Sequence, residues 1–147
     1  MGSNRAMKEA DTWLNRAYGL NQELKASIRT LAMKEASLNS GVARYQSDGT
    51  ESHDPERSKA NREDALLEYS ETMDRVEKLR RNLYEENAKT LKAIDQISTG
   101  ELRAIAIDRY INCMTWKEIA SAEHISKSEA DRRRLRMLEQ MVRIIQN

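Results

Sequence analysis

The chain has no phenylalanine, one proline, five glycines and one cysteine among its 147 residues. Helix breakers are therefore scarce, whereas residue types that lose little side-chain freedom in a helix are abundant. We predict an all-α fold built from long helices. Because 39% of the residues are apolar and 33% are charged, the chain can bury only slender cores.

Cys113 is the only cysteine, which excludes an intrachain disulfide and favours a reducing compartment. No segment approaches the roughly 20 apolar residues that a membrane span needs, and no signal-peptide core is found at the N-terminus. We predict a cytoplasmic protein with no membrane partner. Cys113, His53 and His124 lack the paired spacing of metal ligands, so neither a metal nor another cofactor is predicted.

Motifs of catalytic sites are also missing. The sequence has no Gly-rich phosphate loop, no nucleophile elbow and no ordered acid-base pair. Acidic groups and His53 crowd the segment 48–54, but a solvated linker explains them. We predict that the protein is not an enzyme.

Two long amphipathic segments form the N-terminal part of the chain. Apolar residues recur at a 3-4 spacing from Met7 to Leu38 and again from Leu66 to Ile97. Two helices with one apolar seam each predict an antiparallel coiled-coil hairpin over residues 4–97.

The segment between the two predicted helices is polar. Ser, Asp, Gly and Thr dominate residues 40–54, which predicts a mobile loop. Asp54-Pro55 suits the start of the second helix, because Asp can cap free N–H groups and Pro is tolerated where no N–H is needed. The seam has two interpretations: it is the core of the hairpin alone, or a surface that pairs chains or binds RNA polymerase. A hairpin buries little alone, so we favour a homo-oligomer formed through it.

The C-terminal part carries a repeated helix-start pattern, in which Ser or Thr is followed three residues later by Glu. It occurs three times, at Ser98 with Glu101, Thr115 with Glu118, and Ser126 with Glu129. The pattern predicts a tri-helical unit over residues 98–147. Its predicted buried positions are Leu102, Ile105, Ala106, Tyr110, Trp116, Ile119, Ala120, Ala130, Met137, Leu138, Met141, Ile144 and Ile145.

Basic residues are concentrated in the last predicted helix. The net charge of the chain is only +1, but from Lys127 onward six Lys or Arg face three Asp or Glu. A short helix, a tight turn and an arginine-rich helix indicate a helix-turn-helix that binds DNA. The alternative interpretation is a solvated helix face paired with nearby carboxylates.

The residues from Arg109 through Ala120, with Ile125-Ser-Lys-Ser-Glu-Ala and Leu135-Arg-Met-Leu, resemble region four of bacterial sigma factors. The whole chain is similar to a family of small phage and prophage proteins of Gram-positive bacteria, which join a helical hairpin to such a C-terminus. Members are regarded as transcriptional regulators akin to phage late-operon activators. The resemblance implies binding of promoter DNA and, as a further partner, RNA polymerase.

The resemblance also implies which side chains contact DNA. Lys127, Ser128 and Arg132 are expected to reach base edges or phosphates, because an Arg fork fits O6 and N7 of guanine. Backbone contacts are implied for Arg133, Arg136 and Lys117. The sequence departs from the sigma pattern at Glu129 and Asp131, which are acidic, and at His124, which stands where the turn often has Gly. A third departure is Arg133-Arg134, where an apolar core contact is expected; we expect the arginine stems to cover that gap while their charged groups reach solvent.

We therefore predict a phage or prophage DNA-binding transcriptional regulator that acts through its C-terminal helix-turn-helix. The alternative is a non-enzymatic structural or interaction protein, such as a DNA-packaging adaptor or a helical hub that binds protein. Acidic Glu129 and Asp131 and the near-zero net charge support the alternative.

Overall fold

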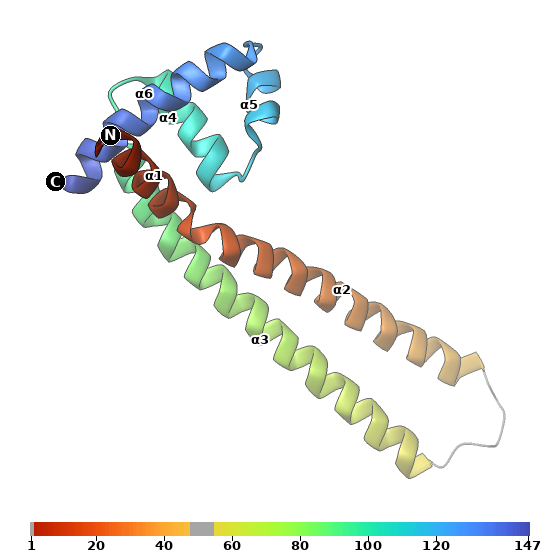
Figure 1. The fold of residues 1–147 in the computed structure, drawn as a ribbon. Helices are drawn as coiled ribbons and strands as arrows, with labels where there is room; N and C mark the ends of the chain where they lie inside the picture. Colours follow the sequence, from red (N-terminus) through yellow and green to blue (C-terminus); the bar gives the residue numbers. More distant parts are fainter. Residues whose placement is uncertain (1, 48–54) are drawn as a thin grey trace. The chain divides into compact units, whose positions relative to one another are not determined.

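A computed structural model describes residues 2–47 and 55–147, with side chains described for residues 2–40 and 56–147. Helices and helical turns form nearly all of this part of the chain and no strand occurs in it, so the all-α prediction is confirmed (Figure 1). The elements are α1 (Gly2–Leu14), a 3-10 turn (Asn15–Ala17), α2 (Tyr18–Ser47), α3 (Pro55–Ile94), α4 (Gly100–Ala106), a π-helical turn (Ile107–Ile111), α5 (Trp116–Ala122) and α6 (Lys127–Gln146). No helix in the described ranges is long and apolar enough to cross a membrane.

The predicted loop over residues 40–54 begins later than expected. Helix α2 continues to Ser47, so the loop prediction is wrong for residues 40–47, and residues 48–54 lie outside the described part. The pair Ser40-Gly41 does not end the helix, because the cost of a single Gly inside a helix is only about 1 kcal/mol. Helix α3 begins at Pro55 as predicted, where the missing N–H of proline costs nothing.

The chain forms two compact units. The first unit comprises Met1–Gly19 and Leu83–Asn147, and the second comprises Leu20–Asn82. The predicted boundary between residues 97 and 98 differs from this division. The difference arises because α1 and the end of α3 pack with α4, α5 and α6 in one core.

The second unit consists of α2 from Leu20 onward and of α3 as far as Asn82, and the two helices run in opposite directions (Figure 1). Among the described residues, two ion pairs connect the helices: Arg75 Nη2 with Glu23 Oε1 at 2.6 Å, and Lys34 Nζ with Glu68 Oε2 at 3.2 Å. Only four of the residues described in this unit are buried: Leu24, Ser27, Val76 and Leu79. The predicted seam is therefore only partly correct, since Ile28, Leu66 and Met73 remain exposed.

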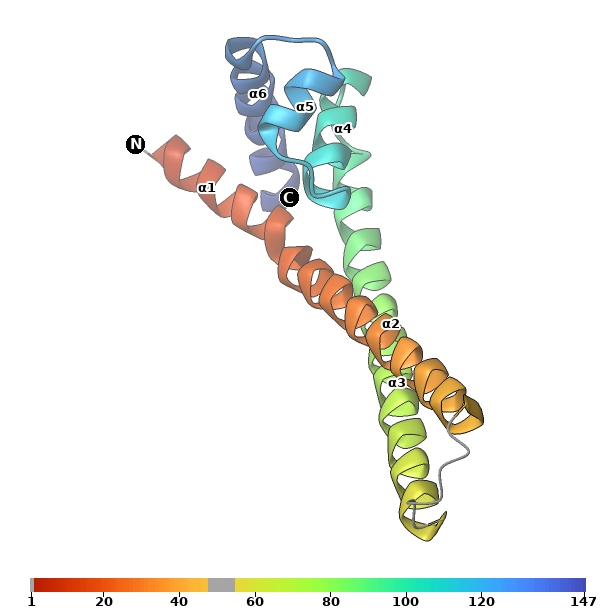
Figure 2. The same cartoon turned by 90° about the vertical axis from the view of Figure 1, so that its right-hand side faces the viewer.

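The core of the first unit is larger and continuous. Helix α1 packs against α6, and α4 and α5 each pack against α6 and the π-helical turn (Figures 1 and 2). Most of the predicted buried positions of the C-terminal helices are buried, while Trp116, Ala120 and Ile144 are half-buried and Ile145 is exposed. The core consists of Ala10, Leu14, Ala93, Ile94, Ile97, Leu102, Ile105, Ala106, Tyr110, Ile119, Met137, Leu138 and Met141.

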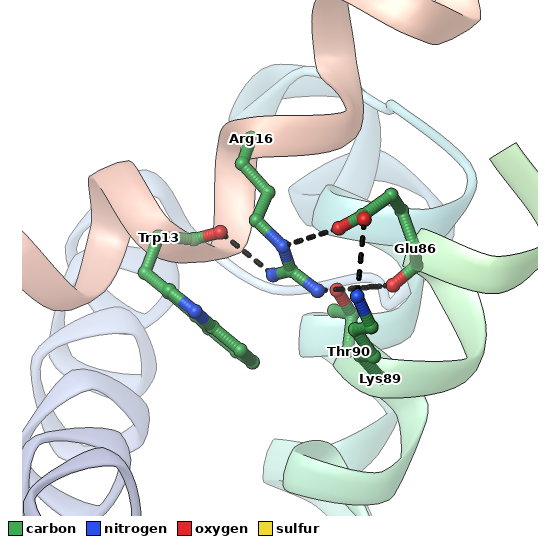
Figure 3. A network of polar contacts seen from close by, with 5 residues as sticks. All are labelled: Trp13, Arg16, Glu86, Lys89 and Thr90. Carbon is green, nitrogen blue, oxygen red and sulfur yellow. Dashed lines mark hydrogen bonds and ion pairs between the residues drawn. The ribbon is translucent and has the colours of Figure 1, made fainter. Parts of the chain in front are cut away.

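A polar network joins the 3-10 turn to the end of α3 within the first unit (Figure 3). The guanidinium of Arg16 lies 3.9 Å from the ring centroid of Trp13 and donates to the Trp13 carbonyl at 2.9 Å. It also donates to the carboxylate of Glu86 at 2.7 Å and to the Glu86 carbonyl at 3.0 Å. Hydrogen bonds from Arg16 and then Lys89 hold the pKa of Glu86 below its ordinary value. The ionised Glu86 thus fixes α1 and its 3-10 turn on α3.

A second polar contact connects α1 to the π-helical turn. The hydroxyl of buried Tyr110 donates to the carboxylate of Asp11 at 2.6 Å. Burial, followed by this hydrogen bond, raises the pKa of Tyr110 above its ordinary value, so the hydroxyl remains a donor throughout the physiological range. The contact satisfies a polar group that would otherwise be costly in the core.

Candidate nucleic-acid interface

Helix α5 begins with a complete capping box. The hydroxyl of Thr115 accepts a hydrogen bond from the Glu118 N–H at 3.1 Å, and the Glu118 carboxylate accepts from the Thr115 N–H at 3.3 Å and its hydroxyl at 2.9 Å. The prediction for this helix start is confirmed. Hydrogen bonds from the Thr115 side chain and then its backbone lower the pKa of Glu118.

The lowered pKa gives a direct test of this cap. Replacing Thr115 with alanine removes the hydroxyl donor, so we expect the pKa of Glu118 to rise toward its ordinary value. Because a depressed carboxylate pKa stabilises the fold above the unfolded pKa, the wild-type cap weakens as pH falls through the folded value. An NMR titration of the Glu118 side-chain carboxyl in both proteins measures the shift. Identical titration curves would contradict the geometry of the cap.

The turn between α5 and α6 has the backbone of a Schellman motif. The Ile125 N–H donates to the Ala120 carbonyl at 3.0 Å, and the His124 N–H donates to the Ser121 carbonyl at 3.2 Å. His124 adopts φ 55°, the left-handed conformation that this position requires. The sequence departure at His124 is therefore accommodated, since His is enriched at positive φ.

Helix α6 begins with half of the predicted capping box. The Ser126 hydroxyl accepts from the Glu129 N–H at 3.1 Å. The Glu129 carboxylate instead accepts from Arg132 at 2.9 Å and from Arg133 at 3.3 Å. Arg132 and Arg133 thus compensate the negative charge of Glu129 within the helix. Of the two acidic residues that would repel DNA here, Glu129 is therefore the weaker obstacle.

The capping box predicted at Ser98 is wrong. Thr99 is the residue that precedes α4, and its side chain makes no capping hydrogen bond. Ser98 donates from its N–H and its hydroxyl to the amide oxygen of Gln140, at 2.9 and 3.2 Å. Ser98 therefore bonds to α6 and not to Glu101, its predicted partner in the capping box. Glu101 forms an ion pair with Arg133 at 3.1 Å instead of capping α4.

Five of the six predicted DNA-contacting residues are exposed in the first unit. Lys117 lies in the first turn of α5, and Lys127, Ser128, Arg132 and Arg136 lie in the N-terminal half of α6. Arg133 differs, because its side chain is only 15% exposed and is held between Glu101 of α4 and Glu129. Arg133 therefore connects α6 to α4.

The ring of Trp116 lies near two arginines. The guanidinium carbons of Arg109 and Arg134 lie 5.9 and 5.6 Å from its ring centroid, within the range of cation–π attraction. Arg109 also donates to the Met114 carbonyl at 3.0 Å, where the chain turns from the π-helical segment toward α5. These contacts fit the predicted packing role of Trp116. Arg134 occupies a core-facing position of the predicted helix, but its contact with Trp116 and that of Arg109 were not predicted, because these contacts depend on helix placement.

One exposed residue of α6 was not predicted as part of the interface. Leu135 is 50% exposed and follows Ser128 and Arg132 along the same side of the helix, at the spacing of successive turns. Apolar side chains at such positions can contact the methyl group of thymine. Asp131 is exposed beside them and makes no hydrogen bond or ion pair with a described residue.

Comparisons with known proteins found no matching family model, no matching curated protein and no matching solved structure.

Proposed function

We propose that the protein is a DNA-binding transcriptional regulator of the phage or prophage type, in which the N-terminal half of α6 enters the major groove. The observation that carries the proposal is the α5–turn–α6 arrangement, with a Schellman turn at His124 and exposed polar side chains at the start of α6. A major groove admits one α-helix, whose first turns contact base edges.

The distribution of charge supports this orientation. Lys127, Arg132 and Arg136 present positive charge on the exposed side of α6, and Lys117 presents it on α5. Glu118 and Glu129 are acidic, but both are engaged in capping or ion pairs. Asp131 is then the single acidic residue at the start of α6 that forms no ion pair with a described residue, and we expect it to disfavour a phosphate or guanine at its position.

Promoter recognition and contact with RNA polymerase follow from the resemblance to sigma region four. Under this proposal α6 selects the site and α5 lies along the phosphates. An interaction protein is the second candidate, and one observation favours it: large apolar side chains of the second unit, among them Met33 and Leu67, are exposed. Such a role and DNA binding use different units, so one chain can have both.

The test is binding of the full chain to duplex DNA across a salt series. Duplexes enriched from a randomised pool serve as probes, and fluorescence anisotropy measures affinity. Each phosphate contact contributes a slope of about −0.9 in log affinity against log salt. We expect Lys117→Ala to reduce the slope by about 0.9 while leaving the preferred sequence unchanged.

Lys92→Ala is the matched control, because Lys92 is an exposed lysine of α3 outside the proposed interface. Its slope should equal that of the wild type. Absence of binding to every duplex at low salt would refute the proposed function. Equal losses in the two variants would show that binding follows total charge and not the helix-turn-helix.

A further inference from the structure

The two faces of the α2–α3 hairpin differ. On one face, Glu23 pairs with Arg75 and Lys34 pairs with Glu68. The seam is the row of buried and half-buried residues through which α2 and α3 face each other. Arg75 precedes buried Val76 of this row by one residue, and Glu68 precedes half-buried Tyr69. One residue is a rotation of about 100°, so these ion pairs lie on one side of the seam.

The opposite face carries apolar side chains. Ile28 follows buried Ser27 by one residue, and Leu66 and Met73 follow half-buried Ala65 and Thr72, which face the other helix. This places the three apolar residues across the seam from the ion pairs. They are 37%, 48% and 47% exposed. The ion pairs align the two helices so that Ile28 of α2 lies beside Met73 of α3. Leu66 lies two helical turns from Met73, toward the N-terminal end of α3. These three residues form what we call the apolar face.

We propose that the apolar face binds a second copy of this chain, antiparallel to the first, so that two hairpins form a four-helix bundle. Antiparallel helix pairs commonly complete a core in this way, because one hairpin cannot enclose its own seam. All the residues concerned lie within the second unit, so the proposal is independent of DNA binding by α6.

A two-fold axis at the level of Tyr69 makes the face complementary to itself. In this register Met73 lies against the partner's Leu66, and by symmetry Leu66 lies against the partner's Met73. The same axis brings Arg62 opposite the partner's Glu77. A stable pairing needs this match of apolar with apolar and of opposite charges.

Helix α2 follows the same register. The ion pairs between the helices fix the level of each α2 residue relative to α3. The axis then places Lys25 opposite the partner's Glu35. All four charged residues, Lys25, Glu35, Arg62 and Glu77, are exposed and form no ion pair with a described residue of their own chain. One like-charged pair, Lys59 with the partner's Arg80, falls at the ends of the contact, where solvent screens it.

This pattern selects a second copy over an unrelated protein. An isologous contact is favoured where charges on the face meet opposite charges at the symmetry-related level. Arg62 with Glu77 and Lys25 with Glu35 meet this condition, and the like-charged pair at the ends of the contact is the exception. The apolar area is small, so the expected dissociation constant is roughly micromolar. Sedimentation velocity of the full chain over a range of concentrations should show a monomer–dimer equilibrium.

Adjacent leucines provide a matched pair of variants. Leu66→Lys places a charge in the apolar face and is expected to weaken the dimer by at least about tenfold. Leu67 is 58% exposed and points away from the seam, so Leu67→Lys should leave the dissociation constant unchanged. Circular dichroism confirms equal helix content. A wild type that remains monomeric at the highest concentration, or equal effects of the two variants, would overturn the proposal.

Charge reversal tests the register. Arg62→Glu alone and Glu77→Arg alone should each weaken the dimer several-fold, because each creates two like-charged pairs across the axis. The combined variant R62E/E77R restores opposite charges and should recover most of the wild-type affinity. A combined variant weaker than either single one would contradict antiparallel pairing at this register.

Discussion

Replacing Leu14 with alanine is expected to destabilise the C-terminal helices, although Leu14 lies near the other end of the sequence. Its side chain is 1% exposed and belongs to the core shared by α1, α3, α4, α5 and α6. Truncating a buried leucine costs about 2–5 kcal/mol, through lost burial and the cavity that remains. A domain of this size has a free energy of unfolding of about 5–15 kcal/mol, so the loss is a large part of the total.

Urea denaturation followed by circular dichroism measures the change in free energy, and hydrogen exchange locates it. Amides of α5 and α6 should exchange faster in the Leu14→Ala protein, because their core has lost a contact. Leu24→Ala is the matched control, since Leu24 is 8% exposed but lies in the second unit. Unchanged exchange in α5 and α6 of the Leu14 variant would show that α1 is dispensable for that core.

The sequence could not reveal this role of α1, because its periodicity does not show that Leu14 packs in the first unit and Leu24 in the second. The 3-4 spacing continues from Leu14 to Leu24 as in one uninterrupted helix. The 3-10 turn between them is held by Arg16, which contacts Glu86, a residue 70 positions away. A contact of that sequence separation leaves no local pattern.

Local hydrogen bonding was the most predictable feature. The caps at Thr115 and Ser126 are formed by residues within one turn of each other, and the stripes of α4 and α6 follow from helical spacing alone. The same pattern failed at Ser98, where Gln140 of α6 offers a competing acceptor. A sequence motif thus predicts a cap reliably only where no distant side chain competes for the same donor.

The candidate site shows the same limit for arginines. Helical spacing places Arg133, but not Arg132, at a core-facing position of the predicted helix, yet the resemblance implied a DNA contact for both. The structure shows what holds Arg133 there, because Glu101 of α4 pairs with it. Helix placement therefore decides which arginine contacts solvent, and it moves Arg133 from the predicted set of phosphate contacts toward a structural role.

Arg132 and Arg133 are accordingly expected to respond in opposite ways to substitution. Arg132→Glu replaces an exposed fork at the start of α6 with a negative charge, and we expect DNA affinity to fall about 100-fold. The loss combines a contact worth about 1–3 kcal/mol with repulsion from phosphate. Its melting temperature should change little, because the Arg132 side chain is 62% exposed and its ion pair with Glu129 is screened.

Arg133→Ala should give the converse result. The substitution leaves Glu101 and Glu129 without their shared partner and exposes part of the α4–α6 contact, so Tm should fall by roughly 3–8 °C. DNA affinity, measured well below Tm, should change less than about threefold, since the side chain is largely inaccessible to phosphate. A large loss of affinity at unchanged Tm would restore Arg133 as a backbone contact. Loss of affinity in neither variant would show that α6 does not bind DNA, because the exposed charge at its start would then have no effect on binding.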